Sequence, residues 1–270
     1  MVRSPIALLT LFAATLAGCT PEGTPGEGKG ADGQASITAP ADATPTPASL
    51  DIQEKNDVYT FEYSYPDAAG RIAGLKALLD ARQAEAHKAH VEAAINARAD
   101  ADAGGYPYRP YGYGTKWEVV ADLPDWLSLS ADHWEYTGGA HPNSGFDALL
   151  WDKQAGAAHD PISLFTSADA LEEVVKPDFC RMLDMQRARK RGQPVVRDDE
   201  DWQNACIGLE SVTVILGSSN RRTFDRVGFL VPPYAAGPYA EGSYEVTLPV
   251  NAAMVEAVKP EFRDAFSAVQ

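Results

Sequence analysis

The first 49 residues of this 270-residue chain most limit what it can fold into, because little in them can join a hydrophobic core. Arg3 precedes an apolar run, residues 6–17, which is too short to cross a bilayer as a helix. This pattern is typical of a secretory signal peptide, here residues 1–18. The run ends in Leu-Ala-Gly-Cys19, the pattern of a bacterial lipobox, so we expect an exported lipoprotein anchored through Cys19. An ordinary signal peptide that contains a cysteine and a buried strand are the alternatives.

Residues 19–49 are dominated by Pro, Gly, Ala, Thr and acidic residues, with Ile37 as the only large aliphatic side chain. Such a segment cannot bury enough apolar surface to offset its chain entropy, so we expect a disordered tether and a folded part over residues 50–270. Thr20 follows the cysteine where an Asp would retain a Gram-negative lipoprotein in the inner membrane. We therefore expect the protein at the outer membrane, facing the periplasm.

The formal net charge is −15, and cleavage after residue 18 removes only Arg3, which leaves −16. Nucleic acid is disfavoured as a partner, because phosphate binding requires a basic patch. A basic protein would be attracted, although acidity can also serve solubility alone.

The chain has three cysteines, and lipidation of Cys19 leaves Cys180 and Cys206 as an even pair in an oxidising compartment. We predict a disulfide between them, with two separate thiols as the alternative. Two isolated cysteines lack the paired spacing of a zinc site, and we expect neither a metal nor a cofactor.

Periodicity and composition predict an α+β fold, an antiparallel sheet with two long helices packed on it. Gly104-Gly105 should end the first helix, and Ser167 should cap the second, which Pro177 should break or kink. The basic run at residues 187–191 is interpreted as the solvated end of that helix. The expected strands are residues 58–65, 116–121, 126–136, 144–152, 211–216, 223–231 and 244–249. The expected helices are residues 72–103 and 167–191 and two short ones over 252–258 and 261–266.

Four tyrosines, Tyr106, Tyr108, Tyr111 and Tyr113, alternate with Pro and Gly after the first helix. They could form an exposed ligand-binding loop, or they could pack onto the domain.

The histidines give no clear catalytic pattern. His87 and His90 share a helix face and could chelate a metal, but no HExxH motif surrounds them, so a solvated face is favoured. Nucleophile-elbow, P-loop and dinucleotide-binding motifs are missing from the sequence. A pair of glycosidase carboxylates cannot be selected without geometry. The residues thus favour a protein that is not an enzyme.

Residues 136–143, YTGGAHPN, form the most distinctive segment. The two glycines permit positive φ, and His141 is held extended by Pro142. A structural turn whose histidine bonds the backbone, a ligand-contact loop that includes Asn143, and a catalytic histidine are the three interpretations.

This segment resembles the YTGGAH-type motif of extracellular domains in the RsiV anti-sigma factor and the PdaC peptidoglycan deacetylase. Residues 162–165 (ISLF) and 229–239 (FLVPPYAAGPY) are similar to two later motifs of these domains. The resemblance covers about residues 58–258 and implies a PdaC-like α/β part over 50–135 and an RsiV-like α+β part over 136–270. It also implies lysozyme or peptidoglycan as a partner, because the RsiV domain binds lysozyme, and it transfers no catalytic domain.

We therefore expect a membrane-tethered binding or sensor module of the cell envelope. An accessory cell-wall hydrolase or deacetylase that uses the His141 region is one alternative. A structural envelope lipoprotein without a specific ligand is the other.

Overall fold

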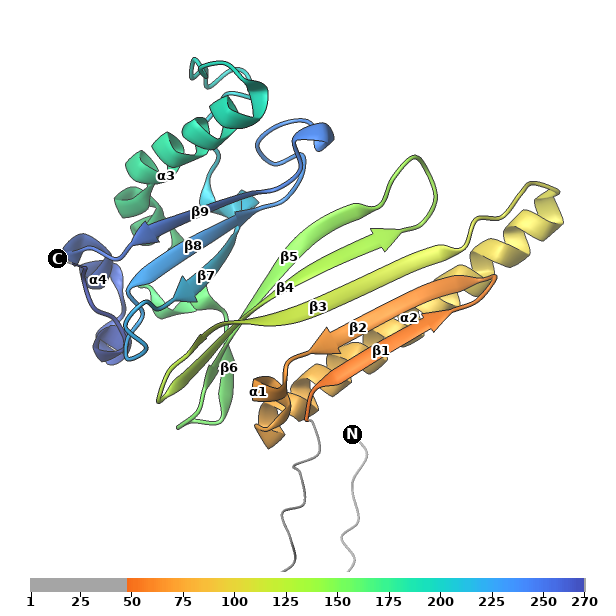
Figure 1. Cartoon of the computed structure of the whole chain (residues 1–270), viewed down its shortest axis with the longest axis horizontal. Coiled ribbons are helices and arrows are strands. Elements are labelled where there is room, and N and C mark those ends of the chain that lie inside the picture. The colour runs from red at the N-terminus through yellow and green to blue at the C-terminus, as the bar shows by residue number, and fades with distance from the viewer. Residues whose placement is uncertain (1–47, 270) are drawn as a thin grey trace, which may run out of the picture. The chain divides into compact units, whose positions relative to one another are not determined.

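The computed structural model describes residues 48–269. This part of the chain contains two β-sheets and two long helices, together with shorter helical segments (Figure 1). The predicted signal peptide, the lipidation site Cys19 and nearly all of the predicted tether lie outside the described residues. The strands are β1 (Leu50–Lys55), β2 (Tyr59–Tyr65), β3 (Tyr111–Asp122), β4 (Trp126–Tyr136), β5 (Asn143–Asp152), β6 (Ala157–His159), β7 (Thr213–Gly217), β8 (Arg226–Val231) and β9 (Tyr244–Pro249). The helices are α1 (Asp67–Gly70), α2 (Ala73–Gly104), α3 (Ala168–Arg191) and α4 (Ala252–Ala257), with short 3-10 turns η1 (Pro161–Leu164), η2 (Leu209–Ser211), η3 (Tyr239–Glu241) and η4 (Pro260–Ala265).

The first sheet has six strands in the order of the sequence, β1 to β6. All its pairs are antiparallel except β2 and β3, which run parallel with Phe61 opposite Tyr113. Parallel neighbours need a long crossover, and here α2 is that crossover. The predicted α+β class is confirmed, with this parallel pair and a separate second sheet as differences in detail.

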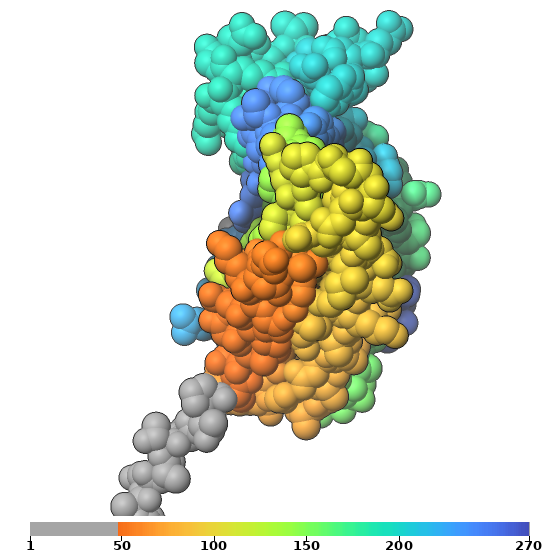
Figure 2. Space-filling model, turned by 90° about the vertical axis from the view of Figure 1, so that its right-hand side faces the viewer, coloured from red at the N-terminus to blue at the C-terminus, as the bar shows by residue number. Residues whose placement is uncertain are grey.

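Alternation along β2 gives this part of the first sheet one covered and one open face. In β2, Phe61 and Tyr63 are buried whereas Glu62 between them is exposed. The buried residues pack with Leu75 and Leu79 of α2 into one of the two hydrophobic cores. Figure 2 shows β1 and β2 (orange) beside α2 (gold to yellow). The other face carries Glu62 on β2, and farther along the sheet its residues Trp126 and Leu150 pack into the core of the second sheet.

The second sheet is antiparallel in the order β7-β8-β9, and α3 packs on it. The core here includes Phe179 of α3 and Phe229 of β8, whose ring centroids are 5.1 Å apart. The Ser167 hydroxyl accepts a hydrogen bond from the Ala170 N–H at 3.0 Å, as expected of an N-cap.

The expected break at Pro177 is wrong, because α3 runs without interruption from Ala168 to Arg191. Val175 and Phe179 on either side of the proline are fully buried. Their tertiary packing outweighs the one backbone hydrogen bond that a proline removes.

The second sheet contacts the first mainly through β7, which packs against β3, β4 and β5. At this junction the Thr213 hydroxyl donates a hydrogen bond to the Phe146 carbonyl at 2.9 Å. β4 ends at Tyr136, the division that we expected between two parts of the chain, and β5 and β6 continue the same sheet beyond it. Among residues 48–269, no helix combines the length and the hydropathy required to span a membrane.

Candidate functional site

The indole ring of Trp134 lies flat against the next strand on the open face of the six-stranded sheet. It spans Gly112 and Gly114 of β3, and a Cβ atom on Gly112 would lie 2.6 Å from the ring. A Cβ on Gly114 would come closer still, so only residues without a side chain permit this contact. One ring face therefore packs on backbone, and the half-buried indole presents its other face to the space above the sheet.

Exposed carboxylates flank this ring. Glu62 of β2 and Asp132 of β4 both line a hollow with Trp134. Among residues 48–269, Lys116 forms an ion pair with Glu118 at 2.6 Å, whereas Glu62 and Asp132 form none. Two carboxylates next to the aromatic ring are thus available to a ligand.

Three adjoining hollows of about 570, 430 and 420 Å3 have Asp132 in their walls, and they form what we call the sheet groove. It crosses the open face from β1 past Trp134 to the segment 232–243 after β8. Phe146 and Tyr239 add two more aromatic rings at that end. The groove combines apolar rings with a few polar groups, which is the composition of a ligand site.

The segment 232–243 forms the second wall of the sheet groove, and basic side chains of α3 hold it from behind. Arg191 donates to both carboxylate oxygens of Glu241, at 2.8 and 3.1 Å. Lys190 donates to the Glu241 and Ser243 carbonyls at 2.6 and 2.5 Å. Burial alone would raise the pKa of Glu241, but its bonds with Arg191 and Tyr244 outweigh burial and lower it.

The interpretation of residues 187–191 as a solvated helix end is wrong for its most buried member. Arg187 is 0% exposed, and it donates to the Ala236 carbonyl at 2.9 Å and the Ala205 carbonyl at 2.8 Å. Its guanidinium also pairs with Asp184 at 3.2 Å. The two carbonyl acceptors lie far from Arg187 along the chain, so sequence spacing does not reveal them. Their hydrogen bonds allow this charged side chain to be buried.

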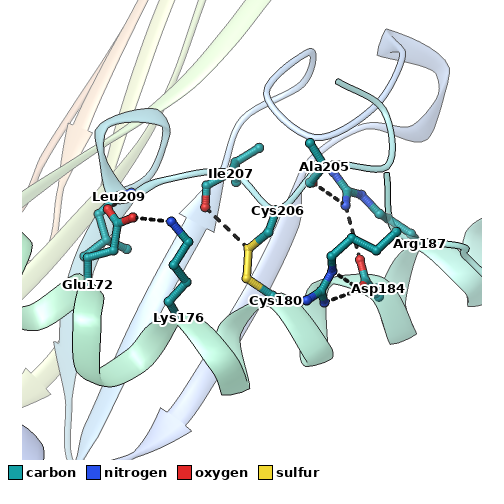
Figure 3. Close-up of a disulfide and its surroundings, with 10 residues drawn as sticks. Glu172, Lys176, Cys180, Asp184, Arg187, Ala205, Cys206, Ile207 and Leu209 are labelled. Carbon is teal, nitrogen blue, oxygen red and sulfur yellow. Dashed lines mark hydrogen bonds and ion pairs between the residues drawn. A yellow bond between two sulfur atoms is a disulfide. The ribbon is translucent and has the colours of Figure 1, made fainter. Parts of the chain in front are cut away.

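The predicted partners Cys180 and Cys206 form a disulfide in the structure, with their Cα atoms 5.4 Å apart. Figure 3 shows that it belongs to a row of contacts along one face of α3. In this row the Glu172 carboxylate accepts from the Leu209 N–H at 3.0 Å, and Arg187 bonds the Ala205 carbonyl. The hydrogen bond from Leu209, and then that from Lys176, lower the pKa of Glu172. The row fixes the loop 203–209 to the helix.

The YTGGAHPN segment is the hairpin between β4 and β5. Gly138 and Gly139 have φ values of 105° and 91°, as the sequence predicted for this pair. His141 stacks on Tyr239 with 3.6 Å between ring centroids. Its Nδ1 lies 2.9 Å from the Pro142 carbonyl and its Nε2 lies 3.2 Å from the Tyr234 hydroxyl.

One tautomer of His141 satisfies both contacts: Nδ1–H donates to the Pro142 carbonyl, and Nε2 accepts from the Tyr234 hydroxyl. Tyr234 has φ 71°, a left-handed conformation that non-glycine residues seldom adopt. The histidine therefore has the backbone bond of the structural-turn interpretation. It also joins the two motifs that carry the family resemblance.

The four candidate tyrosines do not form one loop. Tyr111 and Tyr113 belong to β3, and Tyr113 stacks on Phe61 with centroids 5.4 Å apart. Tyr108 donates to the Val58 carbonyl at 2.8 Å, and Tyr106 is 56% exposed. Three are thus tied to the domain, and Tyr106 remains available for contact.

Some candidates do meet. Tyr106, Tyr108 and Tyr111 line a surface hollow of about 340 Å3 together with Gly138 and Gly139. Asn143 is exposed at the start of β5, opposite Glu135. The tip of the six-stranded sheet therefore presents a second surface, which we call the hairpin hollow.

The solvated helix face that we expected for His87 and His90 is wrong at His90. This side chain is only 5% exposed and packs against Tyr59, Phe61 and Tyr113. His87 is half-buried and bonds Glu54 at 2.9 Å. No group of three or more His, Cys, Asp or Glu in residues 48–269 is placed to hold a metal ion.

Trp134, Asp132 and Glu62 were not predicted as site residues. For Trp134 the sequence contains an indication: Gly112 and Gly114 alternate along a strand, which indicates that a neighbouring group approaches the backbone closely. The glycines were instead attributed to a tyrosine-rich loop. Nothing in the sequence singles out the two carboxylates among 38 acidic residues.

Comparison with known proteins found one family model that matches part of the chain. Residues 52–144 match the family model of the deacetylase PdaC, and this span includes Gly112, Gly114, Trp134 and His141. The predicted resemblance to the PdaC type is thereby confirmed for this part of the chain.

Two solved structures are similar. A member of the DUF3298 family from Bacteroides fragilis is 16% identical, with a TM-score of 0.47, over 80% of this chain and 96% of that one. A DUF3298 family protein from Pseudomonas aeruginosa is 11% identical, with a TM-score of 0.45, over 82% of this chain and 97% of that one. A search of the curated proteins found no significant match.

Proposed function

We propose that this chain is a binding module of the bacterial cell envelope and that its sheet groove holds a cell-wall glycan strand. The observation that carries the proposal is the indole of Trp134, spread over Gly112 and Gly114 with one face free. The apolar faces of sugar rings pack on such a ring, and their hydroxyl groups bond to side chains beside it. Glu62, Asp132 and Ser64 of the groove supply these polar groups.

The position of the groove favours side-chain recognition of a glycan over addition of a peptide strand. A peptide that extends a sheet binds at its edge, where backbone N–H and C=O groups are free. The sheet groove lies on the face of β1 to β4 and not along an edge. Strands β2, β3 and β4 are paired on both sides, and among the described strands of the groove β1 alone has an unpaired edge. Three strand intervals span roughly 14 Å, which leaves room for several sugar rings in a row.

The tether is part of this proposal. Lipidation at Cys19 would hold the domain near the membrane, and the Pro- and Gly-rich sequence after it would separate the domain from the anchor. Cells that produce wild-type protein or the Cys19→Ala variant are fractionated. The variant should leave the membrane fraction, and retention equal to wild type would contradict the anchor.

Sedimentation with purified peptidoglycan tests the binding function. The wild-type protein should pellet with the wall material, and Trp134→Ala should lose most of that binding. Trp202→Ala is the matched control, because Trp202 is 50% exposed and lies outside the groove. Equal pelleting of both variants, or no pelleting of the wild type, would contradict the proposal.

A basic protein such as lysozyme is the second candidate ligand, favoured by the net charge of −15 and by the exposed Tyr106 in the hairpin hollow. Calorimetry at low and moderate salt compares a lysozyme with cytochrome c, a basic control. Selective binding that survives moderate salt and weakens in Tyr106→Ala would support this candidate. Equal binding of both proteins, or of neither, would remove it.

A further inference from the structure

We infer that the sheet groove selects glycans that carry free, protonated amino groups over glycans whose amino groups are acetylated. The inference rests on the proposed glycan-binding function and names the substrate class of the same site. It follows from the distribution of charge in the groove.

Acidic side chains outnumber basic ones in the walls of the sheet groove. Lys116 is the only lysine or arginine among the residues that line its three hollows, and Glu118 pairs with it at 2.6 Å. The acidic residues in these walls are Asp51, Glu62, Glu118, Asp132, Glu241 and Glu245. An anionic group of a ligand is repelled here, and a cationic one is attracted.

The carboxylates without an ion pair lie next to the aromatic ring. Glu62 and Asp132 line one hollow with Trp134, at the middle of the groove. An ammonium group over the face of a tryptophan is attracted by the ring, and a carboxylate beside the ring adds a direct ion pair. An acetylated amino group is neutral and gains neither interaction.

The opening over Trp134 also fits a chain of sugars better than a compact cation. The groove continues on both sides of the ring, toward Gln53 on β1 and toward Tyr239 on the second wall. Successive sugar rings can therefore contact polar groups and aromatic rings at several points, which a single small amine cannot.

Calorimetry with the purified protein and three probes tests the inference. The probes are an oligomer of glucosamine, an oligomer of N-acetylglucosamine of equal length, and an oligomer of lysine. Glu62→Gln with Asp132→Asn removes the charges and keeps the shapes of both side chains. Glu85→Gln with Glu92→Gln makes the same change in charge on the exposed side of α2 and is the control.

The glucosamine oligomer should bind at least about tenfold more tightly than the acetylated one. The groove variant should lose that preference, and the control should keep it. Equal binding of the two glycans would overturn the selectivity and leave the proposed function standing. Equal binding of oligolysine would show attraction by charge alone and would overturn it as well. No binding of either glycan, with wild-type pelleting on peptidoglycan, would also reject the inference, whereas loss of the pelleting too would reject the proposed function.

Discussion

The imidazole of His141 stacks on the phenol ring of Tyr239, with ring centroids 3.6 Å apart and an angle of 12° between the rings. The Tyr239 hydroxyl also donates to the Pro142 carbonyl at 3.1 Å. These contacts join the hairpin of the six-stranded sheet to the segment that forms the second wall of the sheet groove. The groove therefore depends on two parts of the chain that meet only in the folded protein.

Replacement of Tyr239 should loosen this junction. We expect Tyr239→Ala to lower the free energy of unfolding by about 1–3 kcal/mol, through loss of the stack and of buried ring area. Tyr234→Phe removes only a hydroxyl group and should cost less than about 1 kcal/mol. Urea unfolding of both variants measures this, and an equal loss in the two would show that the stack adds no stability.

Stability should depend on pH through His90. Burial lowers the pKa of His90 below its ordinary value of 6.5 and outweighs the backbone groups of Thr60 and Tyr111, which raise it. The unfolded chain takes up this proton near pH 6.5 while the folded protein stays neutral, so stability is greatest above pH 6.5 and falls as the pH drops below it. The nearby Glu135 opposes this lowering and His87 adds to it.

The urea midpoint measured between pH 5 and 7.5 tests this expectation. In His90→Leu the fall in stability below pH 6.5 should be smaller than in the wild type. Identical pH profiles for the two proteins would show that another group sets the dependence.

The disulfide should be a major source of stability for the second part of the fold. Cys180 and Cys206 are 26 positions apart, and a bridge over a loop of this size contributes about 3 kcal/mol. The double variant with alanine at both positions should lose that amount and should no longer respond to a reducing agent. Two freely alkylated thiols in the denatured, unreduced wild-type protein would contradict the bridge.

Arg191 should position the second wall of the sheet groove. Arg191→Met leaves the Glu241 carboxylate without its cationic partner in a site where both side chains are less than one-sixth exposed, at 13% and 15%. We expect a loss of about 2–3 kcal/mol in unfolding free energy and a several-fold weaker affinity for the glycan. Arg189→Met, on the exposed side of the same helix, should change neither.

Unchanged glycan affinity in Arg191→Met, with a folded protein, would show that the wall does not need this ion pair.

Local signals in the sequence predicted most of the elements but not how they meet. The strand pattern of residues 126–136 and 244–249 matches β4 and β9 in full, and Gly105 ends α2 with φ 66°, where the glycine pair was expected to stop it. β1 was missed, and β3 begins five residues before the predicted start. The first residues of β3, including Tyr111, pair with β2. The two strands are separated in the sequence by the 32-residue helix α2, and pairing over such a distance has no local sequence signature.

The candidate site shows the same limit. His141 was singled out from its own motif, but its partners Tyr234 and Tyr239 come from a second motif that spacing does not connect to the first. Trp134 was interpreted only as part of a strand. Gly112 and Gly114 make room for its ring, but they become its neighbours only when β3 pairs with β4.

The central claim is that the free face of the Trp134 ring receives the ligand. The chain has five tryptophans, so their five indole N–H signals can be followed by nuclear magnetic resonance and the Trp134 signal assigned with Trp134→Phe. During titration with the glucosamine oligomer, the Trp134 signal should shift progressively and to saturation, and the signal of Trp202 outside the groove should stay in place. Binding that moves the Trp202 signal and leaves that of Trp134 unchanged would contradict the account.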